Sequence, residues 1–221
     1  MLQFYAMNEL LFCIQILLIV GFALGALKLG RAALTGWVVI LALIANLFVI
    51  KQITLAGFHV TASDTFMIGS VLGLNFLQEY FGKEEARQAT WITFFFMLFF
   101  VLVSQIHLLY EPSPYDTTQT SFQTILSIAP RLFIASMTVF FIVQQFDIAF
   151  FAFLKNRFPH RSFALRTTVS LVLSQFLDTL LFSFAGLYGI VGSLLDIIFV
   201  SFCVKLVAIF LISPFMRWAK T

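Results

Sequence analysis

Six apolar runs make up most of this chain, and each is long enough to cross a bilayer. They cover residues 10–29, 33–53, 89–109, 125–154, 163–187 and 190–214. A helix needs about 20 mostly apolar residues to span the hydrocarbon core. Hydrophobic residues make up 61% of the chain and charged residues 10%, whereas soluble domains hold about 45–50% and 25%. The sequence therefore predicts an all-α integral membrane protein with no soluble domain.

A seventh run, residues 60–80, is diluted by polar side chains, and the charges of the loops indicate whether it crosses. If it does, ten Lys and Arg residues fall on one face of the membrane and Lys51 alone falls on the other. The positive-inside rule makes the basic face cytoplasmic. We therefore predict six strong spans and one weak span, seven crossings in all. The N-terminus then lies outside and the C-terminus inside, in a single polytopic domain over residues 1–221.

Ionisable side chains of both signs lie deep inside these apolar runs. They are Asp64, Glu79, Arg131, Asp147, Asp178, Asp196 and Lys205. A charge at bilayer depth costs at least about 2.5–3.5 kcal/mol on insertion scales, so such residues normally face a bundle interior and mark a ligand or ion path. The pattern predicts a polar cavity inside a helical bundle.

The weak run places its polar residues on one side. At 100° per residue, Asp64, Asn75, Gln78 and Glu79 fall within an arc of about 100°, so the run can turn this stripe inward and cross. The alternative interpretation makes Glu79 an interfacial carboxylate beside Lys83.

Three further polar positions are candidates for the same cavity. Gln175 and Asp178 share one face of the run 163–187, and no neighbour within a turn can neutralise Asp178. Its partner is then a ligand or a structural cation from another helix, with Arg131 and Lys205 available. Asp147 lies in the run 125–154, turned about 160° from Arg131.

Amides and carboxylates beside aromatic rings suit a flat ligand that forms hydrogen bonds. A carboxylate can accept two N–H donors of a guanine-like edge, and Asn or Gln can meet its carbonyl group and ring nitrogen. Asn46, near the middle of its run, belongs to this candidate set. The sequence has no protease motif, no His spacing for a metal and no Gly-rich phosphate loop. We therefore expect no enzyme, no metal, no cofactor and no nucleic-acid partner.

The polar residues stand within longer motifs. These are Gln78-Glu79-Tyr80-Phe81-Gly82-Lys83, Arg131-Leu132-Phe133-Ile134-Ala135-Ser136, Gln144-Gln145-Phe146-Asp147 and Ser174-Gln175-Phe176-Leu177-Asp178, besides residues 46–53, 57–59 and Arg166. With them the chain resembles, over nearly its entire length, the queuosine precursor transporters, a vitamin-uptake-like family.

The resemblance implies uptake of deazaguanine bases, namely queuine or its cyano and aminomethyl precursors, through the cell (inner) membrane for incorporation into tRNA. It also implies a helical bundle related to the substrate-binding subunits of energy-coupling-factor vitamin transporters. Matched residue by residue, it points to Arg131, Asp147, Gln175 and Asp178 first, and then to Asn46 and Glu79. Asn75 stands where many members carry Asp, so no proton or cation role carries over to it.

A mechanism follows as a hypothesis. Asp178, Gln175 and Asn46 bind the substrate near the middle of the membrane, and Glu79 and Asp147 line the cytoplasmic half of the path. The sequence leaves open a self-sufficient carrier, a binding subunit that docks on an ATP-driven energising module, and, third, a membrane enzyme. It also leaves open whether the chain forms a homo-oligomer.

Overall fold

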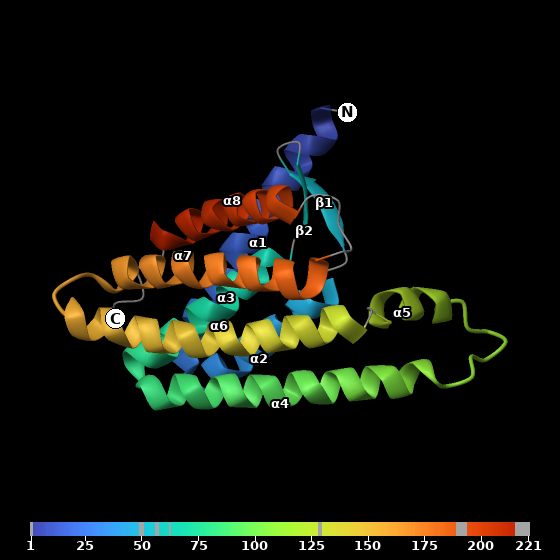
Figure 1. Cartoon of the computed structure of the whole chain (residues 1–221), viewed down its shortest axis with the longest axis horizontal. Coiled ribbons are helices and arrows are strands. Elements are labelled where there is room, and N and C mark those ends of the chain that lie inside the picture. The colour runs from blue at the N-terminus through green and yellow to red at the C-terminus, as the bar shows by residue number, and fades with distance from the viewer. Residues whose placement is uncertain are drawn as a thin grey trace.

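Nine helical segments and one short hairpin make up this computed structural model. It describes residues 2–48, 51–55, 58–61, 63–127, 130–188 and 194–214, and all structural statements refer to these residues. The elements are α1 (Leu2–Leu29), α2 (Arg31–Phe48), β1 (Gln52–Leu55), β2 (Phe58–Thr61), α3 (Asp64–Tyr80), α4 (Lys83–Leu108), α5 (Gln119–Leu126), α6 (Pro130–Arg157), α7 (Phe163–Phe182), the π-helical turn η1 (Ser183–Leu187) and α8 (Leu194–Ile212). The elongated helical bundle (Figure 1) has the all-α membrane class expected from composition.

Five of the described helices are long and apolar enough to cross a membrane. They are Met7–Leu29, Arg31–Phe48, Lys83–Leu108, Ile134–Arg157 and Phe163–Gly186. The apolar run of α8, Ile197–Ile212, is shorter, and α3 is not among the candidates. The chain is thus a multi-pass membrane protein. Because the hydropathy of α3 does not mark it as a span, its position in the bundle matters.

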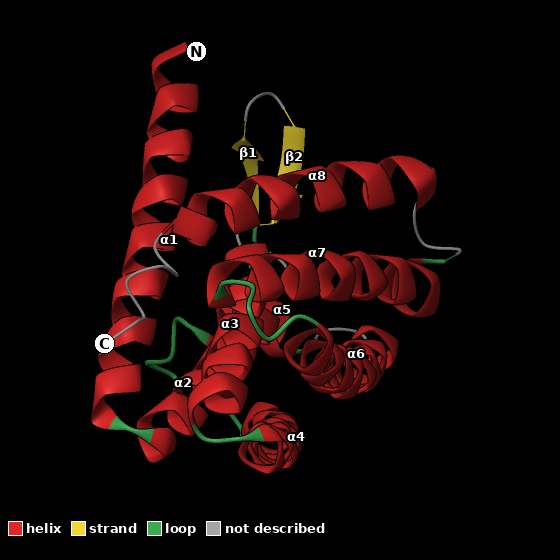
Figure 2. Ribbon diagram, turned by 90° about the vertical axis from the view of Figure 1, so that its left-hand side faces the viewer, coloured by secondary structure: helices red, strands yellow, loops and turns green. Residues whose placement is uncertain are grey.

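The helix α3 runs through the centre of the bundle. Figure 2 places α1 and α2 on one side of it and α6 and α7 on the other. A Cβ atom on Gly69 would lie 2.5 Å from Ile19 Cγ2 of α1 and 2.8 Å from Leu41 Cδ1 of α2. On Gly73, one turn later, it would lie 2.9 Å from Val38 Cγ2. This pair of glycines lets the helices pack closely, as small residues do in membranes.

Two boundaries of the predicted spans are wrong. The runs 33–53 and 60–80 were expected to be helical to their ends, but Gln52–Leu55 and Phe58–Thr61 pair as an antiparallel hairpin. β-Branched residues such as Ile53 and Thr54 favour strands, and an apolar run alone does not distinguish strand from helix. The N-terminal half of α1 flanks the hairpin, where Asn8 Nδ2 donates to Thr54 O at 2.9 Å.

The run 125–154 was also predicted as one helix, but it is split. The short helix α5 ends at Leu126, and α6 begins at Pro130. Proline suits the first position of a helix because the N–H that it lacks would have no partner there. The loop before α5 protrudes beyond the bundle (Figure 1).

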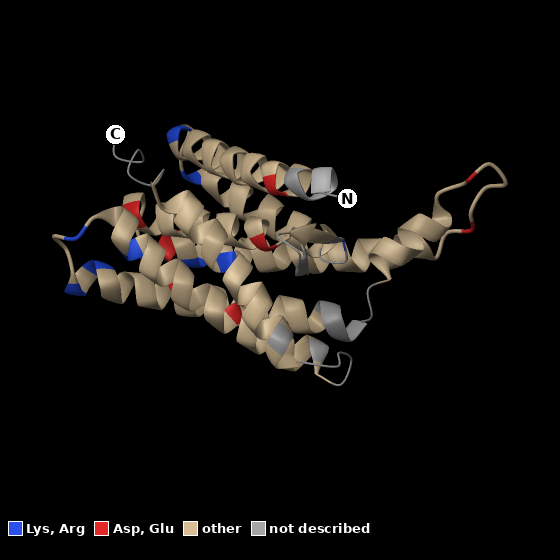
Figure 3. Ribbon diagram, turned by 90° about the horizontal axis from the view of Figure 1, so that it is seen from above, with Lys and Arg blue, Asp and Glu red and all other residues tan. Residues whose placement is uncertain are grey.

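Charge is distributed unevenly between the two ends of the bundle. Lys and Arg residues gather at the end where α1 meets α2, α3 meets α4 and α6 meets α7, whereas the protruding loop at the opposite end carries acidic residues (Figure 3). Gly30 and Gly82 adopt positive φ values of 99° and 106° at two of the basic turns, a conformation that favours glycine. We call the first end the basic end. We call the opposite end the hairpin end, because the β1–β2 hairpin lies toward it (Figure 1).

Candidate functional site

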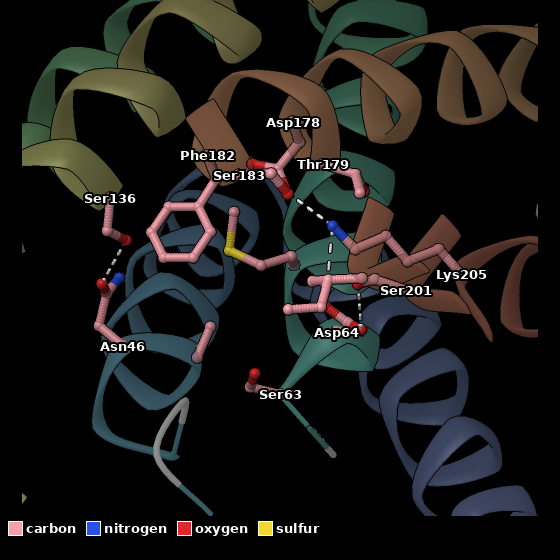
Figure 4. A pocket seen from close by; sticks show the side chains of 13 residues that line it. Asn46, Ser63, Asp64, Ser136, Asp178, Thr179, Phe182, Ser183, Ser201 and Lys205 are labelled. Carbon is pink, nitrogen blue, oxygen red and sulfur yellow. Dashed lines mark hydrogen bonds and ion pairs between the residues drawn. The ribbon is translucent and has the colours of Figure 1, made fainter. Parts of the chain in front are cut away.

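A cavity of about 160 Å³ lies between α2, α3, α6, α7 and α8, toward the hairpin end (Figure 4). It is lined by Ala45, Asn46, Ser63, Asp64, Met67, Ser136, Asp178, Thr179, Phe182, Ser183, Ile197, Ser201 and Lys205. One water molecule needs roughly 10–15 Å³ of such space. The cavity is therefore much larger than a single water site, and its walls combine apolar surface with charged and hydrogen-bonding groups.

One wall of the cavity carries a cluster of three charges, which we call the triad. Lys205 Nζ of α8 lies 2.6 Å from Asp178 Oδ2 of α7 and 3.7 Å from Asp64 Oδ1 of α3. The Lys205 side chain is 4% exposed and each carboxylate side chain 13%. Ser201 Oγ donates to Asp64 Oδ2 over a long 3.4 Å. The triad thus joins three helices, and Asp64 is its more loosely held acid.

The opposite wall carries an amide. Ser136 Oγ of α6 donates to Asn46 Oδ1 of α2 at 2.7 Å, and Asn46 Nδ2 donates to Ala42 O at 2.9 Å. The ring of Phe182 lies between this amide and the triad (Figure 4). A planar group in the cavity would therefore meet an amide, an aromatic ring and carboxylates.

A second set of polar residues lies within α3, α6 and α7, nearer the basic end, and we call it the buried polar core. It comprises Asn75, Gln78, Gln144, Asp147, Ser170, Ser174 and Gln175, all 0–2% exposed. Ser170 and Ser174 each donate a hydroxyl to Asp147 Oδ1 at 2.6 Å. Gln78 Nε2 donates to Ile148 O at 2.8 Å, which fastens α3 to α6.

Three amides of the buried polar core have no hydrogen-bond partner among the described residues. They are Asn75, Gln144 and Gln175, and both polar side-chain atoms of each are affected. Buried polar groups are normally satisfied, and an unsatisfied one costs about 1–3 kcal/mol. The protein therefore keeps polar groups in its interior at a cost in stability.

A third cluster lies at the basic end and is made of ion pairs. Glu79 Oε1 lies 2.6 Å from Arg166 Nη2 of α7, and Glu79 Oε2 lies 3.3 Å from Lys155 Nζ of α6. Arg166 also donates to the carbonyls of Pro159 and Arg161. Two cations share one carboxylate here, the reverse of the triad. We call this group the Glu79 cluster.

The predicted site residues fall into different layers of the bundle. Asn46 and Asp178 line the cavity together, whereas Gln175 and Asp147 lie in the buried polar core and Glu79 lies at the basic end. The side chain of Arg131 lies outside the described residues.

Asp178 and Glu79, for which the sequence left two interpretations each, both form ion pairs with other helices. Asp178 does have a cation partner, Lys205, on another helix. Glu79 pairs with Lys155 and Arg166 in the described part of the chain, where no ion pair joins it to Lys83.

Two charged cavity residues are missing from the predicted site, namely Asp64 and Lys205. The signal was present, because each is a charged residue inside or beside an apolar run. Hydropathy and spacing, however, do not indicate how separate helices are rotated against one another. No group of three or more His, Cys, Asp or Glu side chains that could hold a metal occurs among the residues searched, which are the described ones.

Comparison with known proteins gives two matches. The sequence model of a protein family described as "Putative vitamin uptake transporter" matches residues 61–219. A protein of Bacillus subtilis (strain 168) named "Probable queuosine precursor transporter" is 32% identical over 163 residues, which are 73% of this chain and 71% of that protein. No solved structure gives a significant match.

Proposed function

This chain belongs to the vitamin uptake transporter family, and we propose that it carries queuosine precursors, that is, queuine or other 7-deazaguanine bases, across the cell (inner) membrane. The B. subtilis relative that bears this name spans most of the chain. The imported base would supply tRNA modification. We propose transport without chemical change to the base, and therefore no enzyme.

The cavity is the observation that supports this proposal most strongly. Its two polar walls hold carboxylates on one side and the Asn46 amide on the other, with Phe182 between them. A deazaguanine base is flat, with N–H donors on one edge and a carbonyl group. The donors suit a carboxylate such as Asp178, the carbonyl suits the amide, and the face of the base suits the aromatic ring.

The buried polar core supports a path from the cavity to the basic end. Gln175 lies one turn from Asp178 along α7, and Asp147 accepts from two serines of the same helix. Polar atoms without protein partners can be satisfied by water or by a passing base. In this proposal Gln175 and Asp147 line the path, and the Glu79 cluster closes it in the conformation described here. Arg131 remains in the proposed set on the strength of the resemblance alone.

We further propose seven crossings, with the N-terminus outside and the C-terminus inside, in a single domain over residues 1–221. With 17 residues, α3 is about 25 Å long at 1.5 Å per residue. Its charged and amide groups are turned toward neighbouring helices, so they are not exposed to lipid. The basic end then faces the cytoplasm, as the positive-inside rule requires.

A self-sufficient carrier fits this arrangement better than a subunit that only binds, because polar groups continue from the cavity through the bundle. A binding subunit needs the cavity but not the buried polar core beneath it.

The test is the queuosine content of tRNA in cells that can neither synthesise nor import the base. Supplied with a low concentration of queuine or a precursor, cells that express this chain should regain queuosine, and cells that express Asp178→Asn at equal membrane abundance should not. An absence of queuosine in the first strain, with the protein present in its membrane, contradicts the proposal.

A further inference from the structure

The charges that line the cavity do not balance. Asp64 and Asp178 bring two carboxylates, Lys205 brings one ammonium group, and the other described lining residues are uncharged. Lys205 is paired closely with Asp178 at 2.6 Å and more distantly with Asp64 at 3.7 Å. When both acids are ionised, one negative charge is therefore in excess, and it resides mainly on Asp64.

Such an excess is costly on carboxylates that have little contact with solvent. Burying an unbalanced charge is strongly unfavourable even after relaxation, and both carboxylate side chains are only 13% exposed. The weak donor to Asp64 is Ser201 at 3.4 Å, which offsets little of that cost. A cation placed beside Asp64 would complete two charge pairs in the cavity.

From this imbalance we infer that the cavity selects, among deazaguanine bases, those with a positively charged side arm. This inference rests on the proposed function and specifies its substrate. The ammonium group of an aminomethyl-type base binds Asp64, beside the hydroxyl group of Ser201. A neutral cyano-type base fits the same walls but leaves the excess charge of Asp64 unbalanced, so it binds more weakly.

The arrangement also gives the bound base a direction. Asp64 and Asn46 lie on different sides of the cavity (Figure 4), so a side arm that reaches Asp64 leaves the carbonyl group of the base for Asn46 and its flat face for Phe182. Charged hydrogen bonds are roughly twice as strong as neutral ones. The side arm, and not the shared ring system, therefore accounts for the difference in affinity.

The experiment is competitive uptake of two bases, one cationic and one neutral. Cells that express the chain, and that can neither synthesise nor otherwise import the bases, receive aminomethyl-deazaguanine, whose primary amine is protonated at neutral pH, together with cyano-deazaguanine, which is neutral. The ratio of the two uptake rates is compared for the wild type, Asp64→Asn and the control Asp116→Asn. Asp116 is exposed in the loop before α5. Hydrogen bonds from Thr118 hold the pKa of its carboxyl group below the usual value, so it is charged at neutral pH.

The wild type should prefer the cationic base. Asp64→Asn should lower the ratio roughly 10- to 100-fold, the scale for losing one hydrogen bond to a charged group, whereas Asp116→Asn should leave the ratio unchanged. The folded state of Asp64→Asn should persist because Lys205 and Asp178 still form a balanced pair.

Equal uptake of both bases by the wild type would overturn the inference and leave the proposed function standing, because the excess charge would then be balanced by a proton or an inorganic cation. This wild-type ratio decides the matter even if the variant is poorly expressed. An unchanged ratio in a folded Asp64→Asn protein would overturn the inference as well. Uptake of neither base would instead refute the proposed function itself.

Discussion

Lys205 has a different role from the two acids that it contacts, and their substitutions should differ accordingly. Asp64→Asn or Asp178→Asn leaves one carboxylate paired with one ammonium group. Lys205→Met leaves two buried carboxylates with no cation among the described lining residues. Breaking a buried pair in this way costs about 3–5 kcal/mol.

In thermal unfolding of the purified protein in detergent, Lys205→Met should therefore unfold at a clearly lower temperature than either acid variant. An equal fall in unfolding temperature for Lys205→Met, Asp64→Asn and Asp178→Asn would show that the triad is only a structural ion pair.

Gln175 offers a test of whether the buried polar core is kept for function. Its amide is fully buried and has no hydrogen-bond partner among the described residues. Replacing such a group by an apolar one of similar shape is nearly neutral or stabilising. Gln175→Met should therefore keep or raise the unfolding temperature while it lowers uptake of the base several-fold. The matched control is Gln88→Met, on the exposed surface of α4, which should change neither quantity. A large loss of stability in Gln175→Met would contradict the account.

Sequence patterns predicted the chemistry of the site better than its geometry. Charge inside apolar runs identified every member of the triad as unusual, and helical spacing placed Gln175 and Asp178 on one helix face. The pairing of Lys205 with Asp178 depends on how α7 and α8 are rotated and on their relative depth. These quantities are set by packing between helices, which a pattern along one helix does not contain.

At the scale of elements, the position of α3 depends on its glycines. Gly69→Leu would force a side chain against Ile19 of α1 and Leu41 of α2, where even a Cβ atom has no room. Overpacking of this kind costs typically about 1–3 kcal/mol, and here it would also move the helix that carries Asp64. We expect a lower unfolding temperature and a matching loss of base binding. Gly21→Leu is the control, because a Cβ atom there would meet nothing within 4 Å. Similar behaviour of the two variants would refute the close packing of α3.

Hydropathy predicted the helices well where apolar runs and helix boundaries coincide. It failed at residues 52–53 and 60–61, which belong to the paired strands, and at residue 130, where a new helix begins at proline. The weak run was recognised as a helix because its polar residues share one side. The small residues at positions 69 and 73 explain why this helix is central, and the hydropathy of the run did not indicate that.

For the whole molecule, the proposed orientation can be read by cysteine labelling in intact cells. Cys13 and Cys203 are first replaced by Ser, and single cysteines are introduced at Tyr115 in the protruding loop or at Arg161 at the basic end. Both positions are exposed. A membrane-impermeant maleimide should label Tyr115→Cys from outside, and Arg161→Cys only after permeabilisation. The reverse labelling pattern would show the opposite membrane orientation. Labelling of both cysteines in intact cells would contradict the span count.

The central claim is that this chain alone moves a deazaguanine base across a membrane. The most direct measurement is uptake of radiolabelled aminomethyl-deazaguanine by vesicles that contain the purified chain and no other protein. The account predicts saturable uptake, faster than in empty vesicles and lost in Asp178→Asn. Saturable binding of the base without entry into the vesicle lumen would contradict the claim, and would make the chain a binding subunit that needs an energising module.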